Sequence, residues 1–149
     1  MTVTFREARR ADVPAVIALL VDDGLGATRE TGDMAIYWRA FEVMQSTDGN
    51  TVVVGERDGR VIATYQITII AGLSLRASTR AQLESVRVAS DLRGQRIGHL
   101  LIADAETRAR DAGCSLMQLT MNESRKDTAR FYASLGFTPS HIGYKRELI

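Results

Sequence analysis

The chain has 149 residues, of which 45% are hydrophobic, and its 19 Lys and Arg against 18 Asp and Glu leave a formal net charge of +1. This length fits a single domain, residues 1–149, that buries roughly 70% of its unfolded surface and needs no disulfide or metal to fold. The balanced charge argues against nucleic acid as a partner. The sequence has no apolar run near the ~20 residues of a membrane span and no apolar signal core at its N-terminus, so we expect a cytoplasmic protein with no membrane partner.

The N-terminal segment predicts a strand followed by a helix. Residues 4–8 have the composition of a strand, and Asp12, with Pro14 shortly behind it, is typical of a helix start. Apolar residues then recur on one side of this helix. A polar, glycine-containing loop is expected over residues 22–33.

A second helix and a β-hairpin are predicted next. The helix is indicated by large apolar side chains at helical spacing, namely Met34, Tyr37, Trp38, Phe41 and Met44. Residues 51–56 and 60–70 are rich in β-forming residues and flank Asp58-Gly59, a dipeptide that favours a tight hairpin turn.

The C-terminal half predicts alternating strands and helices. A strand over residues 83–89 is followed by a polar break and an amphipathic helix, whose apolar positions include Ile97, Leu100, Leu101, Ala105 and Ala109. Gly113 ends this helix, a strand covers residues 116–121, and a last helix ends at Gly136 as its C-cap. With a final strand, the order β α α β β β α β α β predicts an α/β fold with a mixed sheet and helices on both faces.

Residues 92–98 (LRGQRIG) have the composition of a phosphate-binding turn at the start of a helix. A helix N-terminus carries unpaired N–H groups and a partial positive charge, which together with Arg suit a pyrophosphate. Gly94 and Gly98 allow the backbone to approach a ligand or a neighbouring segment closely. The spacing excludes a Walker loop and a dinucleotide fingerprint. A helix start that uses Arg and Gly only for packing and solubility explains the turn equally well.

With this turn and the last predicted helix, the sequence resembles the GNAT superfamily of acyl-CoA-dependent N-acetyltransferases. Residues 131–137 (FYASLGF) match that family's Phe-Tyr-x-x-Leu-Gly-Phe segment throughout. The family's pyrophosphate loop reads Arg/Gln-x-x-Gly-x-Gly/Ala, which Arg93 and Gly98 fit, whereas Arg96 stands at the usual Gly. Seven residues before Tyr132, where many members have Asn, this chain has Arg125. The specific motifs span residues 83–148, and the N-terminal half agrees in its order of elements.

The resemblance implies a mostly antiparallel sheet whose fourth and fifth strands splay apart, with the pantetheine of acetyl-CoA, the co-substrate, inserted between them. The backbone of the fourth strand then faces the pantetheine, and the turn before the next helix holds the pyrophosphate. The alternative to a cofactor contact is a solvated strand position for Arg87 and an exposed helix position for His99. The expected cofactor contacts are Val86, Arg87, Val88, Arg93, Gly94, Gln95, Arg96, Ile97, Gly98, His99, Asn122 and Arg125.

Acetyl transfer from a thioester to an amine constrains the catalytic residues. A primary amine with a pKa of about 10.4 is mostly charged at pH 7, so a base must accept its proton, and the departing thiolate benefits from a proton donor. The resemblance places Tyr132 beside the thioester sulfur as that donor, with packing of the last helix as the alternative role. Glu84, two residues before Val86, is the candidate base, directly or through water, and a solvated outer-face Glu is an equal alternative.

The resemblance also places the acceptor amine between the first two helices and their connecting loop. Acidic and aromatic groups there suit a cationic amine such as a polyamine, an aminoglycoside or a lysine side chain, whereas a solvated loop above a core-facing helix is the alternative. These residues are Asp22, Asp23, Glu30, Asp33, Tyr37, Trp38 and Phe41. The C-terminal half is also similar to aminoalkylphosphonate acetyltransferases. The similarity lies in Arg125, Lys126, Asp127, Ser140 and His141, and the basic Arg125 and Lys126 would contact either an anionic substrate or the CoA phosphates.

The sequence therefore predicts an N-acetyltransferase that uses acetyl-CoA in a ternary complex, with a primary amine of a small molecule or a protein as acceptor. A non-catalytic acyl-CoA-binding sensor or interaction module is the alternative. A homodimer is compatible with the family, but no segment specifies its interface. Cys114 is expected to be a structural thiol and His141 a loop or strand-edge residue, and no Cys/His cluster has metal-ligand spacing.

Overall fold

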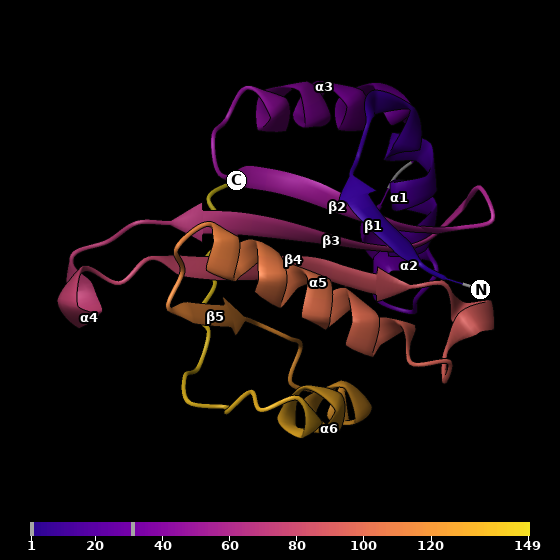
Figure 1. Cartoon of the computed structure of the whole chain (residues 1–149). Coiled ribbons are helices and arrows are strands. Elements are labelled where there is room, and N and C mark those ends of the chain that lie inside the picture. The colour runs from indigo at the N-terminus through magenta and orange to yellow at the C-terminus, as the bar shows by residue number, and fades with distance from the viewer. Residues whose placement is uncertain (1, 31) are drawn as a thin grey trace.

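The computed structural model describes residues 2–30 and 32–149; Met1, and Thr31 within the predicted loop 22–33, lie outside the described residues. Within these ranges the chain forms a five-stranded sheet of order β1-β2-β3-β4-β5 (Figure 1). Neighbouring strands from β1 to β4 are antiparallel, and β5 runs parallel to β4, which confirms the predicted mixed, mostly antiparallel sheet. The strands are β1 (Thr4–Glu7), β2 (Asn50–Arg57), β3 (Arg60–Ile70), β4 (Arg80–Val88) and β5 (Leu116–Leu119).

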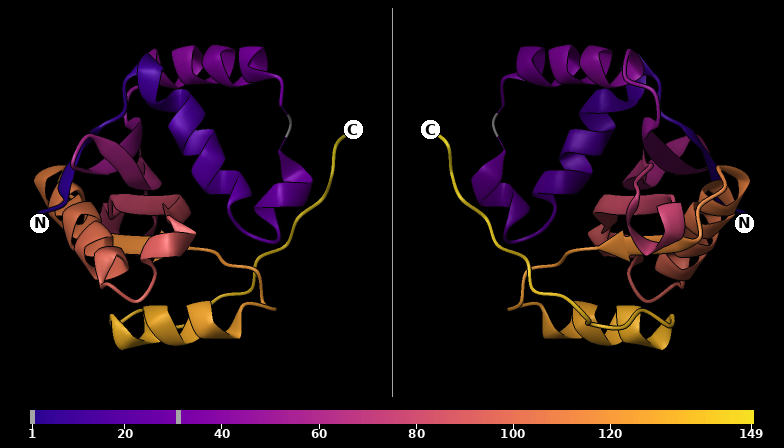
Figure 2. Two further views of the ribbon diagram at one scale, coloured as in Figure 1. Left: turned by 90° about the vertical axis from the view of Figure 1, so that its right-hand side faces the viewer. Right: turned by 90° about the vertical axis from the view of Figure 1, so that its left-hand side faces the viewer.

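Helices cover both faces of the sheet, as predicted. α1 and α3 lie on one face and α5 on the other, while α6 lies beyond β5 (Figure 2). The loop predicted over residues 22–33 contains the short helix α2, and α4 at the tip of the β3–β4 connection is a single turn with left-handed backbone. The helices are α1 (Val13–Val21), α2 (Gly26–Arg29), α3 (Met34–Gln45), α4 (Ser74–Ala77), α5 (Ile97–Asp111) and α6 (Lys126–Ser134), with 3-10 turns η1 (Arg10–Asp12) and η2 (Ser90–Leu92). No helix in the described ranges is long and apolar enough to cross a membrane.

The β2–β3 hairpin turns at the predicted dipeptide. Asp58 and Gly59 have φ angles of 53° and 76°, so both central residues are left-handed, which matches the right-handed twist of the flanking strands. Arg57 and Arg60 form the last pair of the ladder on either side of the turn. The turn leads into β3, which at 11 residues is the longest strand of the described sheet.

The hydrophobic core has two layers, one on each face of the sheet. On the α5 face, Leu101 and Ala105 pack against Tyr65 and Leu83, and all four are at most 1% exposed. The Tyr65 hydroxyl donates to Asp104 on α5, so the one polar atom of this ring is satisfied. On the other face α1 and α3 pack against β2 through a smaller cluster formed by Ala8, Val13, Phe41 and Val54.

The predicted final strand does not form. Residues 138–149, the C-terminal arm, follow α6 as extended chain with no strand partner among the described residues (Figure 2). The arm passes the end of β5, where Gly143 approaches the methyl group of Thr120, and then leaves the body of the molecule. A strand is held by hydrogen bonds to a neighbouring strand, so a strand-like sequence remains irregular where none lies beside it.

Replacing Leu101 by Ala tests the packing of α5 on the sheet. The Leu101 side chain is fully buried, so Leu101→Ala leaves a cavity and is expected to lower the free energy of unfolding by about 2–5 kcal/mol. Leu100, the preceding residue, is 49% exposed, and Leu100→Ala is expected to stay within about 0.5 kcal/mol of the wild type. Urea denaturation followed by circular dichroism measures both. Equal losses in the two variants would contradict this packing.

Candidate active site

The pairing between β4 and β5 ends halfway along β4. The last pair is Leu83–Leu119, whereas β4 continues to Val88. Ser85 lies between these points with a φ angle of 53°, and β4 forms a bulge against β3 here. The predicted splay is confirmed, and one edge of residues 84–88 is left without a strand partner in the described part of the chain.

Backbone groups of Val86 and Val88 face this open edge. The N–H of Ala89 donates to the carbonyl of Ile62 on β3 at 2.8 Å, and along an antiparallel strand the backbone groups point alternately to the two sides. The groups of Val86 and Val88 therefore point into the gap beside β5, where a ligand can satisfy them. The Val86 carbonyl also accepts a hydrogen bond from Arg87 Nη1 at 2.9 Å.

The predicted phosphate turn lies between η2 and α5. Gly94 and Arg96 have φ angles of 81° and 61°, so the chain takes two left-handed steps before α5 begins at Ile97. A non-glycine residue in this conformation costs about 1–3 kcal/mol, which explains why the family pattern has Gly where this chain has Arg96. Ile97 is 3% exposed and offers a ligand only its backbone, whereas Arg93, Gln95 and Arg96 are exposed around the first N–H groups of the helix.

Gly98 allows α6 to pack on the start of α5. A Cβ atom on Gly98 would lie 3.0 Å from Cζ of Phe131, so a larger side chain would push α6 away. The ring of His99 contacts the same Phe131 edge-on, with the ring centroids 5.3 Å apart. The close approach predicted at Gly98 is thus made by a side chain of α6.

Tyr132 is half-buried on α6. Its ring packs against those of Phe131 and Phe137, with centroids 5.2 and 5.5 Å apart. Burial raises the pKa of Tyr132, while the charges of Arg87 and Arg125 act in the opposite direction. The phenol therefore keeps its proton at neutral pH, which a general acid requires.

Two arginines near Tyr132 share one carboxylate. Oδ2 of Asp23 lies 2.7 Å from Nε of Arg87 and 2.9 Å from Nη2 of Arg125. The Nε–H of Arg87 does not point at this oxygen, so the closer contact is an ion pair without an aligned hydrogen bond. Burial pushes the pKa of Asp23 upward, but hydrogen bonds from the Gly26 N–H and Arg125 and the two guanidinium charges hold it at about 2. The cluster therefore carries an excess positive charge.

Asp22, the preceding residue, connects the same loop to the phosphate turn. Its carboxylate accepts hydrogen bonds from the N–H and the hydroxyl of Ser90 at 2.8 and 2.9 Å, which lower its pKa. Its carbonyl accepts a hydrogen bond from Arg93 at 3.3 Å. The α1–α2 loop is thus tied through Asp22 to the turn before α5 and through Asp23 to the start of α6.

A cavity of about 190 Å³ lies between α1, α3 and the sheet. Its walls are mainly apolar, and it reaches Ser85 at the bulge of β4. Two of the predicted acceptor residues, Tyr37 and Phe41, line it. A small molecule bound in this cavity would therefore lie against the half of β4 that has lost its β5 partner.

The other predicted acceptor residues do not line this cavity. Glu30 accepts a hydrogen bond from the Tyr37 hydroxyl at 2.6 Å, and Asp33 caps the N-terminus of α3. Trp38 lies under the guanidinium of Arg10, 4.9 Å from the ring centroid. The expected acidic wall is absent from the cavity lining because the carboxylates of this segment accept hydrogen bonds from neighbouring groups.

Glu84, the predicted base, is exposed on the open half of β4. Glu84 precedes Ser85 and pairs in register with Gln66. Ser85 and Gln66 line the cavity between α1, α3 and the sheet. Arg87, on the same strand, is within electrostatic reach of Tyr132. The predicted acid and base therefore lie at the same half of β4.

Asn122 has a local role in the turn before α6. Its Oδ1 accepts hydrogen bonds from the N–H and the hydroxyl of Ser124 at 3.0 and 2.6 Å. Arg125, further along the same turn, instead reaches the carboxylate of Asp23. The two residues predicted here as cofactor contacts thus have different partners.

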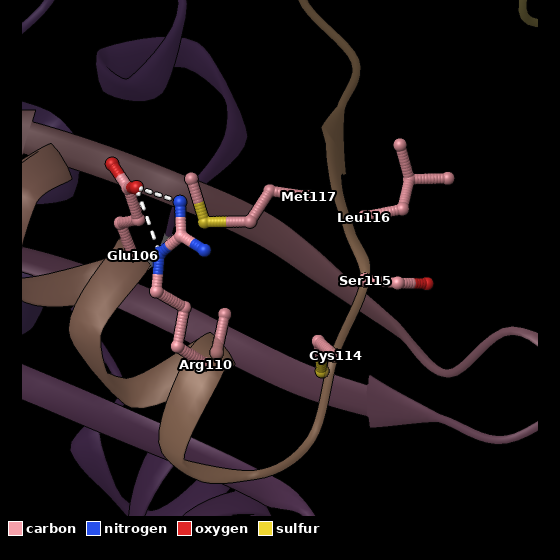
Figure 3. Close-up of a pocket in the computed structure, with 7 residues that line it drawn as sticks. Glu106, Arg110, Cys114, Ser115, Leu116 and Met117 are labelled. Carbon is pink, nitrogen blue, oxygen red and sulfur yellow. Dashed lines mark hydrogen bonds and ion pairs between the residues drawn. The ribbon is translucent and has the colours of Figure 1, made fainter.

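A further cavity, of about 170 Å³, lies at the opposite end of β5 (Figure 3). Glu106 and Arg110 of α5, an ion pair at 2.6 Å, line it together with Cys114. Burial raises the pKa of the Cys114 thiol, which keeps it protonated and poorly nucleophilic at neutral pH. Among the described residues no group of three or more His, Cys, Asp or Glu side chains is placed to hold a metal ion.

The sequence did not predict the contacts of Asp22 with Ser90 or those of Asp23 with Arg87 and Arg125. The available signal was Arg125, because a half-buried guanidinium at a position where the family has Asn requires a carboxylate partner. That partner lies 102 residues earlier in the chain, so no local pattern identifies it.

Comparison with known proteins places this geometry in a family. Residues 15–137 match the model of the acetyltransferase (GNAT) family. The aminoalkylphosphonate N-acetyltransferase of Salmonella typhimurium is 34% identical over 92 residues, which are 62% of this chain, and the chain spans only 59% of that protein's length.

Solved structures share the fold over the whole chain. The crystal structure of a transcriptional regulator from Bacillus halodurans C-125 has a TM-score of 0.94 at 37% identity, covering 99% of this chain and 100% of that one. Glucosamine-6-phosphate N-acetyltransferase from Arabidopsis thaliana has a TM-score of 0.81 at 22% identity, covering 100% of both chains, a likeness of fold alone. Because the family model spans most of the chain, and the splayed strands and the turn before α5 agree with it, the protein belongs to the acetyltransferase (GNAT) family.

Proposed function

We propose that the protein is an N-acetyltransferase that transfers an acetyl group from acetyl-CoA to the primary amine of a small molecule by direct attack in a ternary complex. The observation that carries this proposal is the gap beside β4. Backbone groups of Val86 and Val88 point into it, and Tyr132, which keeps its proton, lies near the same strand.

The residues around the gap fit a long, anionic thioester cofactor. Val86 and Val88 offer backbone donors and acceptors to the amides of the pantetheine. The start of α5, with Arg93, Gln95 and Arg96 exposed around it, offers N–H groups and positive charge to the pyrophosphate. Bound acetyl-CoA supplies the activated acetyl group.

Proton transfers in the reaction are assigned to two side chains. Glu84 accepts a proton from the acceptor amine, through a water molecule because its side chain is exposed. The neutral amine nitrogen then forms a bond to the acetyl carbon and releases its second proton to water, and the carbon–sulfur bond breaks. Tyr132 donates its proton to the sulfur, which leaves as a thiol, and the phenolate recovers a proton from solvent.

We further propose that the acceptor amine carries an anionic group. Arg87 and Arg125 have one carboxylate between them, so the cluster retains positive charge for a ligand next to Tyr132. The apolar cavity has room for a short carbon skeleton. The Salmonella relative named above acts on aminoalkylphosphonates, which combine these two features.

A non-catalytic acyl-CoA sensor remains the alternative from another class of protein. A sensor needs the gap and the turn but no proton donor beside the thioester, whereas the raised pKa of Tyr132 supports a proton donor in this chain. Release of free thiol from acetyl-CoA on addition of an amine distinguishes the two, because a sensor releases none.

Calorimetric titration with acetyl-CoA tests the cofactor site. We expect a micromolar Kd for the wild type and binding weaker by about 10- to 100-fold in Arg93→Ala, because a charge-assisted contact worth roughly 1.5–3 kcal/mol is lost. Arg110→Ala, an exposed arginine near the other end of α5, is the control and should leave the Kd unchanged. Absence of wild-type binding would contradict the proposal.

Tyr132→Phe tests the proton donor, since it preserves the ring packing and removes the hydroxyl. We expect kcat to fall by about 10²- to 10⁴-fold with unchanged acetyl-CoA binding. Because burial raises the pKa of Tyr132, the wild type should lose activity by deprotonation of this group only above pH 10 or so, the ordinary pKa of Tyr. Tyr144→Phe, an exposed tyrosine in the arm, is the control. Glu84→Gln removes the proposed base and should also lower kcat, and an unchanged kcat in Tyr132→Phe would exclude Tyr132 from the mechanism.

Steady-state kinetics with 2-aminoethylphosphonate and propylamine test the anionic acceptor. The wild type should have a lower KM for the phosphonate. Arg125→Gln should raise that KM by about 10- to 100-fold with little effect on propylamine, because a charge-assisted hydrogen bond is lost. Arg110→Gln, an exposed arginine near the other end of α5, should change neither KM. A wild-type preference for propylamine would show that the cluster does not bind the acceptor.

A further inference from the structure

The mainly apolar cavity between α1, α3 and the sheet contains a small set of polar side chains. A ligand in such a cavity is oriented by the few polar groups that converge on it. Five of the lining residues have a polar side chain, namely Tyr37, Thr64, Tyr65, Gln66 and Ser85. The hydroxyl protons of the first three are already engaged, with Glu30, the carbonyl of Val53 and Asp104 as their acceptors. Gln66 and Ser85 are therefore the candidates for contact with a ligand.

Asn50 on β2 fixes the amide group of Gln66. Nε2 of Gln66 donates to Oδ1 of Asn50 at 2.9 Å, and the same oxygen accepts a hydrogen bond from the Thr68 hydroxyl at 3.4 Å. The amide nitrogen is therefore held toward β2. Its oxygen, Oε1, accepts no hydrogen bond from residues 2–30 or 32–149, although the side chain is half-buried. A half-buried amide oxygen without a donor is an oriented acceptor for a ligand.

The β3–β4 register places Gln66 beside the open half of β4. Gln66 lies opposite Glu84, and directly opposed residues of antiparallel strands have Cβ atoms roughly 4.5–5.5 Å apart. The register then shifts at the bulge, so that Thr64 pairs with Arg87. Gln66 is thus the β3 neighbour of the proposed base, on the wall of the cavity that reaches Ser85.

We propose that Gln66 binds the acceptor nitrogen and makes the enzyme selective for primary amines, an inference that rests on the proposed function. A primary amine that has given one proton to Glu84 still has two N–H groups. One proton is lost when the nitrogen attacks, and the other remains in the amide product. Oε1 of Gln66 accepts a hydrogen bond from the retained N–H, which orients the nitrogen for attack. An N-methyl amine has a methyl group in place of this N–H, so Oε1 loses its donor.

The ratio of kcat/KM for a primary amine to that for its N-methyl analogue tests this contact, with 2-aminoethylphosphonate and propylamine as the primary amines. The wild type should prefer the primary amine by about 10-fold or more, because the analogue leaves an acceptor unsatisfied. Gln66→Met keeps the length of the side chain and removes the oxygen, so the preference should fall by about 3- to 10-fold. Gln118→Met is the matched control, since Gln118 is a half-buried glutamine on β5 that donates to Gln82 at 2.7 Å and does not line the cavity. Its preference should equal that of the wild type.

The preference separates a contact with the acceptor from a structural role of Gln66. Loss of a structural bond to Asn50 lowers activity toward a primary amine and its N-methyl analogue alike, which leaves the ratio unchanged. Gln66→Glu retains an oxygen acceptor and should keep the wild-type preference, which provides a second test if the Met variant does not fold.

The outcomes distinguish this inference from the proposed function. A wild type that acetylates amines without preferring the primary one would overturn the role of Gln66 alone. So would an unchanged preference in Gln66→Met, an equal fall in Gln118→Met, or a loss of the preference in Gln66→Glu. A wild type that acetylates none of the four amines would overturn the proposed function and, with it, this inference.

Discussion

The loss of pairing between β4 and β5 beyond Leu83 is the constraint around which the site is arranged. Backbone groups that lose a strand partner must find another one, since a buried unsatisfied donor or acceptor costs about 1–3 kcal/mol. The bulge at Ser85 bends β4 away from its neighbour at this point, a device that is frequent beside active sites. The turn before α5, Tyr132 and the apolar cavity all border the half of β4 that is left open. The fold therefore leaves this strand edge open in the described part of the chain.

Local sequence patterns predicted the parts of the site that depend on local conformation. The turn at residues 92–98, the helices after it and the hairpin at Asp58-Gly59 follow from glycine positions and apolar spacing, and the structure has them there. The contacts of Asp23 could not be predicted in this way, because Arg125 reaches it from a distant segment that only the folded chain brings close. The prediction of a final strand was wrong for a related reason. The strand pattern of residues 138–149 is local, but a strand forms only where a sheet edge lies beside it, and the described chain brings none there.

Two arginines depart from the family pattern, and the structure accommodates them by different means. Arg96 adopts a left-handed backbone, so the cost of replacing Gly is conformational and is borne by the turn itself. Arg125 has a negative φ of −88°, and the cost there is the burial of a charge, which the carboxylate of Asp23 offsets. The first departure can be reversed by a single substitution, whereas the second involves two segments of the chain.

The pair Asp22–Asp23 ties the α1–α2 loop to the turn before α5 and to the start of α6. Asp22 is matched to Ser90, and Asp23 to both Arg87 and Arg125. A loop grafted from a relative without an acidic residue at position 23 would leave two guanidinium groups facing each other with no counterion. Conversely, this loop placed in a host with Asn at position 125 would bury a carboxylate with one cation fewer. Exchange of the α1–α2 loop between relatives therefore has to include the start of α6.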